Sequence, residues 1–169
     1  MEKVLNKFLL IGVILFLVSS EFLLPQEEKG KLNLKIKAQK EVRIKENGKI
    51  VSKLIPIKKV RRGDIILYTI SYTNTGKENL NNPSIIDPIP EGTVYMKGSA
   101  GGKNAEIFFS INGGQTYQKP PVTYTVRKKD GSTEKRIASP EMFTHVKWII
   151  NKKLKPGESG EVFFKVKIK

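Results

Sequence analysis

The chain has 169 residues, with 31 Lys or Arg against 16 Asp or Glu, and a formal net charge of +15. It contains no Cys, which excludes thiol catalysis, thiolate metal sites, disulfides and lipid attachment through an N-terminal Cys. Most of the basic residues are Lys, and abundant Lys together with Glu is an indication of a thermophilic host. The length suits one domain with a single hydrophobic core.

The N-terminus has the pattern of an export signal. Lys3 and Lys7 form a short positive region before the unbroken apolar run from Phe8 to Val18. Small residues follow at Ser19 and Ser20, which predicts cleavage before residue 21. The run is shorter than the roughly 20 apolar residues that a membrane-spanning helix needs. We therefore expect a signal peptide over residues 1–20, with an uncleaved N-terminal anchor as the alternative.

The chain that follows divides into a linker and one domain. We expect a linker over residues 21–31, because residues 25–31 are polar, contain Pro and Gly and show no period. Residues 32–169 carry no helical stripe and consist of alternating segments separated by turn residues. We expect one β domain over this range. The protein would be exported to the periplasm, the outer surface or the medium.

The first part of the domain predicts a strand and a hairpin. Leu32, Leu34, Ile36 and Ala38 alternate with polar residues and Lys, the pattern of a half-buried strand with a Lys-rich outer face. Asn47-Gly48 is the strongest short-range hairpin signal, since a type I′ turn needs a positive φ at both central residues. The return strand, residues 50–57, would end at a sheet edge because it contains a Pro. Residues 58–64 form a basic turn.

The best-patterned strand follows at residues 65–74. Its residues Tyr68, Ile70 and Tyr72 share one face, and we expect them in the core. Asn74 ends this strand in a turn in which its side chain bonds nearby backbone groups. A short strand over residues 83–87 leads to a stiff corner that contains two prolines.

The rest of the domain predicts further strands. Residues 97–104 form a Gly-rich loop, residues 110–117 a tight hairpin and residues 127–139 a polar excursion with its own turn. Strands are expected over residues 105–111, 122–126, 143–150 and 162–168. In total, eight to ten strands with Gly and Pro turns indicate an all-β, antiparallel sandwich of two sheets.

Several of these residues occur in a recognisable order. They are Arg62-Gly63-Asp64, Tyr68-Thr69-Ile70, Thr73-Asn74-Thr75-Gly76, Asp87, Pro90, Gly92 and Tyr95. In this order the chain resembles the prokaryotic surface-protein conserved repeat domain family, domain of unknown function number eleven. The resemblance implies an immunoglobulin-like sandwich on exported or envelope proteins, with a structural or adhesive role. Two departures are Arg62 in place of the usual Pro and a single copy in place of a tandem array.

The sequence indicates structural roles for the signature residues, the residues that carry this resemblance. Asp64, Asn74 and Asp87 lie beside Gly, Pro or turn residues and would hold turns and corners. We assign only structural roles to Asp64, Tyr68, Asn74, Gly76, Asp87, Pro90 and Gly92.

The sequence indicates no catalytic, cofactor or metal site. His145 is the only His, and no nucleophile-elbow pattern accompanies it. One His without Cys is a poor start for zinc, and no cluster of acids suggests calcium. Ser110, Asn112, Thr116 and Tyr117 are similar to the Asp-box of sialidase-like propellers, a hairpin brace. A secreted hydrolase remains a remote alternative, because folding could still bring Glu residues together.

The positive charge is the one feature that argues for a partner. Lys58, Lys59, Arg61 and Arg62 form the nearest thing to a cluster and could contact anions. Only five of the 31 basic residues are Arg, which disfavours nucleic acid. We expect an exported, non-catalytic structural or interaction module whose partners are envelope proteins or anionic envelope polymers. The alternative is a module that binds lipopolysaccharide, acidic glycan or nucleic acid. The sequence leaves the oligomeric state open.

Overall fold

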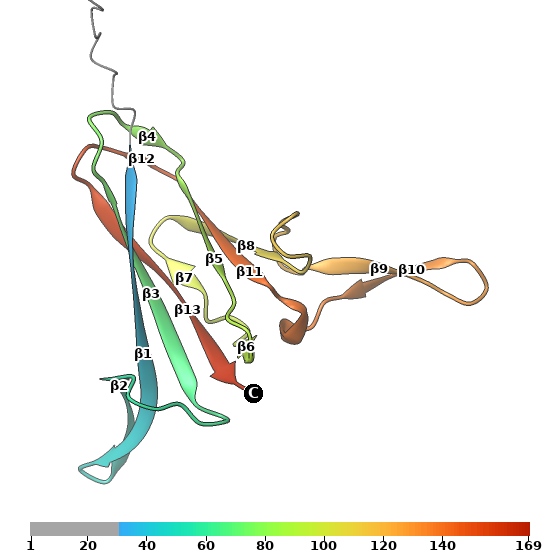
Figure 1. Ribbon diagram of the computed structural model, residues 1–169, viewed down its shortest axis with the longest axis horizontal. Helices are drawn as coiled ribbons and strands as arrows, with labels where there is room; N and C mark the ends of the chain where they lie inside the picture. Colours follow the sequence, from blue (N-terminus) through green and yellow to red (C-terminus); the bar gives the residue numbers. More distant parts are fainter. Residues whose placement is uncertain (1–30) are drawn as a thin grey trace, which may run out of the picture.

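The computed structural model describes residues 31–169. The predicted signal peptide and all but the last residue of the predicted linker lie outside this range. The described chain is nearly all β, in several antiparallel sheets (Figure 1), with a single 3-10 turn at Pro140–Met142. Within residues 31–169, no helix is long and apolar enough to cross a membrane. The prediction of an all-β protein is therefore confirmed.

The largest sheet is organised around β3, which pairs along its length with β1 on one side and β13 on the other. The strand order is β2-β1-β3-β13-β6, and β7 also pairs with β13. The bounds are β1 Leu32–Glu46, β2 Lys49–Pro56, β3 Ile65–Asn74, β6 Thr93–Tyr95, β7 Gly101–Gly102 and β13 Ser159–Ile168.

The predicted first hairpin is present, and its first strand is longer than expected. β1 is one continuous strand of 15 residues. Asn47 and Gly48 have φ values of 48° and 81°, as the type I′ turn requires. β2 ends at Pro56 on the outer edge of the sheet, where the missing N–H leaves no ladder position unfilled.

A smaller sheet, in the order β5-β11-β8, packs against the large one and gives a sandwich-like arrangement. Its strands are β5 Ser84–Pro88, β8 Ala105–Ser110 and β11 His145–Ile150, and the short pair β4 Leu80–Asn81 and β12 Lys153–Leu154 lies near one end. Trp148 of β11 contacts Phe164 of β13 with ring centroids 5.9 Å apart, and Tyr95 of β6 lies 4.8 Å from Phe109 of β8. Thus β11 lies over β13, and β8 over β6.

Alternation along each inner strand builds the core. In β11, Val146, Trp148 and Ile150 are fully buried, and the residues between them are half-buried. In β3, Ile66, Ile70 and Tyr72 are buried, whereas Tyr68 is half-buried and stacks on Phe164. The predicted core face of β3 is therefore correct. The indole Nε1 of Trp148 is buried without a hydrogen-bond partner.

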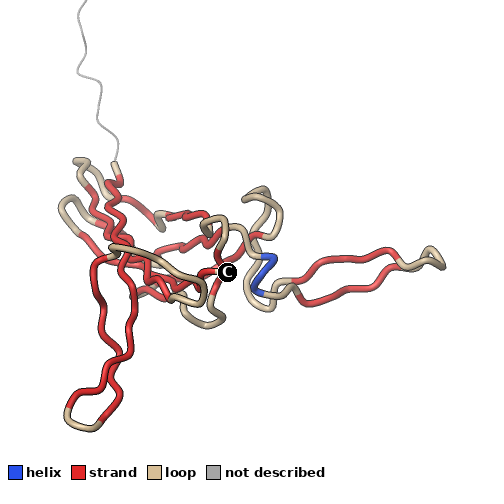
Figure 2. The backbone as a smooth tube through the Cα atoms, turned by 60° about the horizontal axis from the view of Figure 1, so that its bottom comes forward, coloured by secondary structure: helices blue, strands red, loops and turns tan. Residues whose placement is uncertain are grey.

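Two hairpins project from the sandwich in different directions (Figure 2): β1–β2, and β9 Thr123–Arg127 with β10 Thr133–Ile137. The strand expected over residues 122–126 is present as β9, but it pairs only with β10 and joins neither sheet of the sandwich. Phe109 and Gln118 form a single bridge, and Pro120 and Pro121 then follow. Neither proline has an N–H, so the ladder with β8 cannot continue.

The expected burial of Leu34 and Ile36 is also wrong. The register pairs them with Tyr72 and Ile70, so they point to the inner face of the sheet. Nevertheless they are 43% and 58% exposed. The reason is that the smaller sheet has too few strands to reach β1.

Asn74 ties the end of β3 to the neighbouring loops. Its side chain is completely buried, and Nδ2 donates to the carbonyls of Glu78 at 2.7 Å and Leu154 at 3.0 Å. The side-chain Oδ1 accepts from the N–H of Gly76 at 3.1 Å. The predicted local turn bonds are present, and the bond to Leu154 adds a link across 80 residues.

We predict that Asn74→Ala lowers the free energy of unfolding by about 2 to 4 kcal/mol, because it leaves two carbonyls and one N–H without their partner. Urea denaturation measures this loss. Asn33→Ala, on the exposed outer face of β1, is the control and should change stability by less than about 0.5 kcal/mol. Equal stability of the Asn74 variant and the wild type would contradict this role.

Candidate functional site

Three of the four predicted anion-contacting residues meet at one end of the sandwich. Lys58, Lys59 and Arg61 line a hollow of about 630 Å³ together with Lys40, Ile55 and Pro56. Lys40 Nζ donates to Asp64 Oδ2 at 2.6 Å, and the backbone N–H of Arg61 donates to the same oxygen at 2.7 Å. These bonds hold the pKa of the Asp64 carboxyl below its usual value. Asp64 therefore organises the turn and neutralises part of its charge.

Arg62, the fourth predicted residue, faces a separate hollow. This hollow has a volume of about 290 Å³ and includes Lys167 and Lys169. The N–H of Gly63 donates to the carbonyl of Ile168 at 2.9 Å, which joins the turn to the C-terminal strand. We call the whole set the basic end: Lys40, Lys58, Lys59, Arg61, Arg62, Lys167 and Lys169. Sequence reasoning missed its C-terminal members because only the pairing of β3 with β13 brings them to the turn.

The remaining signature residues hold corners. Gly92 has a φ of 74°, a conformation that favours Gly. The carbonyl of Pro90 accepts from the Thr93 hydroxyl at 2.6 Å. Together with the bonds of Asn74 and Gly76 already described, these contacts shape the ends of strands.

Asp87 differs from the other signature residues because its side chain points into the protein. It lies within β5 and is only 9% exposed. Its carboxylate has no hydrogen-bond or ion-pair partner among residues 31–169. Burial raises the pKa of this carboxyl, and the charge of His145 opposes the rise. The sequence predicted that Asp87 holds a corner, but no side-chain hydrogen bond within residues 31–169 gives it that role.

His145 and Ser110 lie directly opposite each other on β11 and β8, but they do not form a nucleophile and base pair. The Ser110 hydroxyl donates to Asn112 Oδ1 at 2.9 Å and accepts from the N–H of Gly114 at 2.9 Å. The Nδ1 of His145 lies 3.1 Å from the Thr144 hydroxyl. Asn112 also bonds Thr116, so this loop has the bonding of a hairpin brace.

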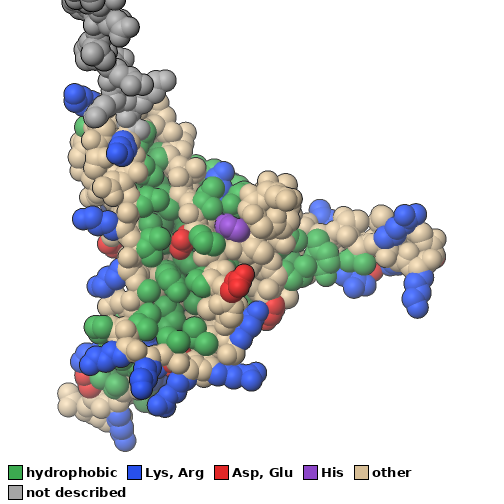
Figure 3. Space-filling model, in the orientation of Figure 1, with side chains coloured by type: hydrophobic (Ala, Val, Ile, Leu, Met, Phe, Trp, Pro, Cys, Tyr) green, Lys and Arg blue, Asp and Glu red, His purple; other side chains and the backbone are tan. Residues whose placement is uncertain are grey.

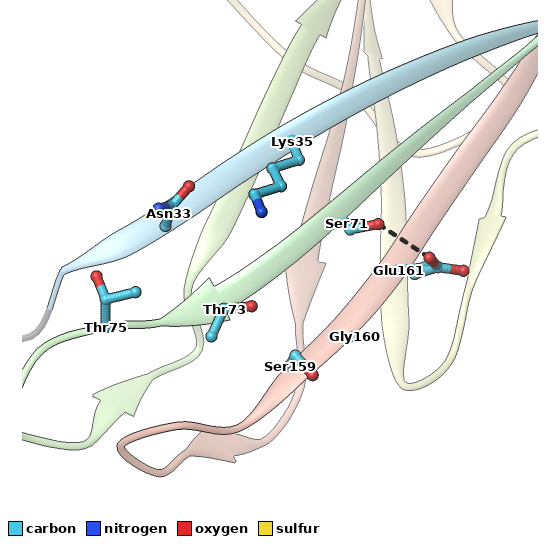
Figure 4. A pocket seen from close by; sticks show the side chains of 8 residues that line it. All are labelled: Asn33, Lys35, Ser71, Thr73, Thr75, Ser159, Gly160 and Glu161. Atoms are coloured by element: carbon cyan, nitrogen blue, oxygen red, sulfur yellow. Dashed lines mark hydrogen bonds between the residues drawn. The ribbon is translucent and has the colours of Figure 1, made fainter.

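The outer face of the large sheet carries a polar hollow of about 620 Å³ (Figure 4). Its lining comes from β1, β3 and β13 and their ends: Asn33, Lys35, Ser71, Thr73, Thr75, Ser159, Gly160 and Glu161. Ser71 donates to Glu161 at 2.9 Å. The lining of this hollow includes no aromatic side chain on which a sugar or base could stack. The hollow therefore resembles an ordinary hydrated face of a sheet.

A fourth hollow, of about 380 Å³, is mainly apolar and lies at the base of the β9–β10 hairpin. Its wall includes Tyr95, Phe109 and Phe143, whose rings pack together. Lys97 is the single cation in its lining. It is separate from the basic end in both composition and position.

The feature that sequence reasoning missed most completely is an uncovered apolar surface between the two sheets. Figure 3 shows hydrophobic side chains in a strip that runs between β1 and β3 on one side and β5 on the other. Its members include the exposed Leu34 and Ile36 and the half-buried Ala38, Tyr68 and Ile89. We call this surface the open edge. The alternation in β1 gave the inward direction of these side chains but could not show that nothing within residues 31–169 covers them.

Within residues 31–169, no group of three or more His, Cys, Asp or Glu side chains could hold a metal ion. Comparisons with protein-family models, curated proteins and solved structures found no match.

We predict that Asp87→Asn changes the pH dependence of stability. Because burial raises the pKa of the folded carboxyl above its ordinary 3.8, the unfolded chain releases this proton first as the pH rises. Wild-type stability relative to the variant should fall from about pH 4 upward, until the folded carboxyl is ionised. Urea denaturation across this range measures the difference.

Asp130→Asn is the control for this titration. Hydrogen bonds from Ser132 lower the pKa of Asp130, so its contribution should be constant above 3.8 and lost only below this pH. If the stability of the wild type relative to Asp87→Asn instead rose with pH, the raised pKa assigned to the Asp87 carboxyl would be wrong.

Proposed function

We propose that this protein is an exported, non-catalytic interaction module of the cell envelope or surface, with an immunoglobulin-like sandwich fold. The observation that carries this proposal is the open edge. Soluble proteins rarely leave a contiguous apolar strip uncovered unless it serves as an interaction site. Leu34 and Ile36 are large, exposed and adjacent to the core, so a partner that covers them gains apolar burial.

Two further observations support the proposal. The order of the signature residues resembles that of an exported repeat family, and Asn74, Gly76, Pro90 and Gly92 hold turns in the structure. The only His and the opposite Ser are both engaged in a loop brace and do not contact each other as a nucleophile and a base would. Localisation in the periplasm, on the surface or in the medium follows from the predicted signal peptide.

Fractionation and cross-linking of host cells test this proposal. We expect the full chain in the periplasmic, outer-envelope or secreted fraction, cross-linked to an envelope protein, with no such adduct in the cytoplasm. A cytoplasmic location, or an envelope that shows no adduct and no defect when the gene is deleted, would contradict it.

The basic end supports a second candidate, a module that binds anionic envelope polymers. Its seven cations meet where the turn before β3, β1 and the C-terminus converge. Of these, Lys40 is paired with Asp64, whereas no carboxylate in the described chain forms an ion pair with the other six. Phosphate or sulfate groups would find several cations within one surface.

We predict that replacing Lys58, Lys59, Arg61 and Arg62 by Gln weakens binding to heparin and lipopolysaccharide, and lowers the slope of log affinity against log salt by about 2 to 4. The control replaces Lys77, Lys103, Lys129 and Lys135, which are exposed and form no ion pair among the described residues. Both variants lose the same charge. Equal weakening in the two would show a response to net charge alone and would contradict a site.

A further inference from the structure

The open edge exists because the two sheets differ in width. β11 lies over β13, as the Trp148 to Phe164 contact shows. β8 lies over β6, as the Tyr95 to Phe109 contact shows, so the strand order β5-β11-β8 places β5 over β3. The smaller sheet ends at β5, and so nothing in the described chain stands opposite the inner face of β1. One additional strand beside β5 would cover Leu34 and Ile36.

The backbone of β5 offers free partners to such a strand. The N–H of Ile150 donates to the Pro83 carbonyl, and the N–H of Ile89 donates to the Thr144 carbonyl. Bonded and non-bonded pairs alternate in an antiparallel ladder. Ser84 and Ile86 therefore direct their N–H and C=O groups away from β11, where no other strand of residues 31–169 pairs with them.

The facing part of β1 is unpaired in the same way. The N–H of Thr75 donates to the Lys31 carbonyl, so odd-numbered residues of β1 bond to β3. Leu34 and Ile36 then point their backbone groups outward, and β2 begins to pair only at Gln39. Two backbone edges that no strand of the described residues pairs with thus border one apolar strip. An extended polypeptide suits this combination, because its backbone can hydrogen-bond to an edge strand while its side chains cover the apolar strip.

Asp87 favours one kind of side chain on a strand added beside β5. A residue opposite Asp87 on an added strand would be a close, non-hydrogen-bonded neighbour, with Cα atoms about 4.5 Å apart. Within residues 31–169, no cation forms an ion pair with Asp87. A Lys or Arg at this position would pair with the buried carboxylate. The next inward positions on either side would lie opposite Ile85 and Ile89, where apolar side chains fit.

Two other occupants are less suited to the open edge. A second copy of the chain is one of them. The large sheet reaches one strand, β1, beyond β5, which is the edge strand of the small sheet. If the β5 strands of two copies paired symmetrically, β1 of each copy would clash with the large sheet of the other. Residues 25–30, which precede β1, are polar and include Glu27 and Glu28. These acids would face Asp87 or the apolar strip.

We infer that the open edge binds an extended segment of a partner protein, with the pattern apolar-x-Lys/Arg-x-apolar, as an added strand antiparallel to β5. This inference rests on the proposed function and deepens it, because it names the kind of segment that the interaction module takes. Side chains of the segment cover Leu34 and Ile36, and its cation meets Asp87.

A synthetic peptide tests the site directly. The probe is acetyl-Thr-Val-Thr-Lys-Thr-Val-Thr-amide, added to the full chain in a mild detergent. Hydrogen exchange should slow at the amides of Ser84 and Ile86 when the peptide binds, whereas the amide of Thr125 on the β9–β10 hairpin should not change. Unchanged exchange at Ser84 and Ile86 at saturating peptide would overturn the inference.

Matched peptides and variants identify the contacts. Glu in place of the peptide Lys, or N-methylation of the following Thr, which faces Ile86, should weaken binding at least about tenfold. Ile36→Glu should do the same. Ile50→Glu, on the β1–β2 hairpin at a residue 75% exposed, should change affinity less than about twofold. Asp87→Asn should remove the preference for Lys over Gln in the peptide. Equal affinities across these pairs would contradict the assignment.

The host cross-linking experiment separates this inference from the proposed function. Loss of the envelope adduct in Ile36→Glu but not in Ile50→Glu supports the open edge. An adduct that survives Ile36→Glu overturns the strand site and leaves the interaction module standing. If the wild type forms no adduct but still binds the peptide, the proposed function fails and the strand site stands.

Discussion

The pairing of β3 with β1 on one side and β13 on the other is the interaction on which the rest of the structure depends. Residues 32–41 and 159–167 both take their register from this one strand. A shift by one residue would exchange the inner and outer faces, exposing Ile66, Ile70 and Tyr72 and burying polar residues such as Ser71 and Thr73. Asn74 completes the strand because its side chain bonds the loops on either side of it. The basic end depends on the same pairing, since it brings the C-terminal lysines to the turn before β3.

The unequal width of the two sheets explains what the protein leaves unpaired. The small sheet has three strands and covers β3, β13 and β6 but not β1. On the inner face of β1, Leu34 and Ile36 consequently have no strand above them among residues 31–169, next to the edge of β5 that no described strand pairs with. Edge strands of this kind tend to pair with other chains unless charges or bulges block them. Here Lys35 and Lys37 of β1 point to the outer face, so beside Leu34 and Ile36 they shield the sheet from one side only.

The charged side chains lie in distinct environments. Many Lys side chains lie on exposed strand faces and loops, where they keep the protein hydrated and attract anions weakly. At the basic end, by contrast, Asp64 orders a turn whose other cations have no carboxylate partner in the described chain. Asp87 has the opposite environment, a buried carboxylate near Tyr68 at the border of an apolar strip. Anion attraction and strand addition would therefore occur at different places on the molecule.

The sequence by itself determined the all-β class, the Asn47-Gly48 turn, the core face of β3 and the local bonds of Asn74. These features depend on period, turn chemistry and near neighbours, which are visible in a single stretch of residues. Only the tertiary structure decided that β9 leaves the sheet, that Arg62 joins Lys167 and Lys169, and that Leu34 and Ile36 stay exposed. The alternation of β1 states which way a side chain points, but burial requires a second layer. Whether that layer exists depends on how many strands the rest of the chain contributes opposite β1.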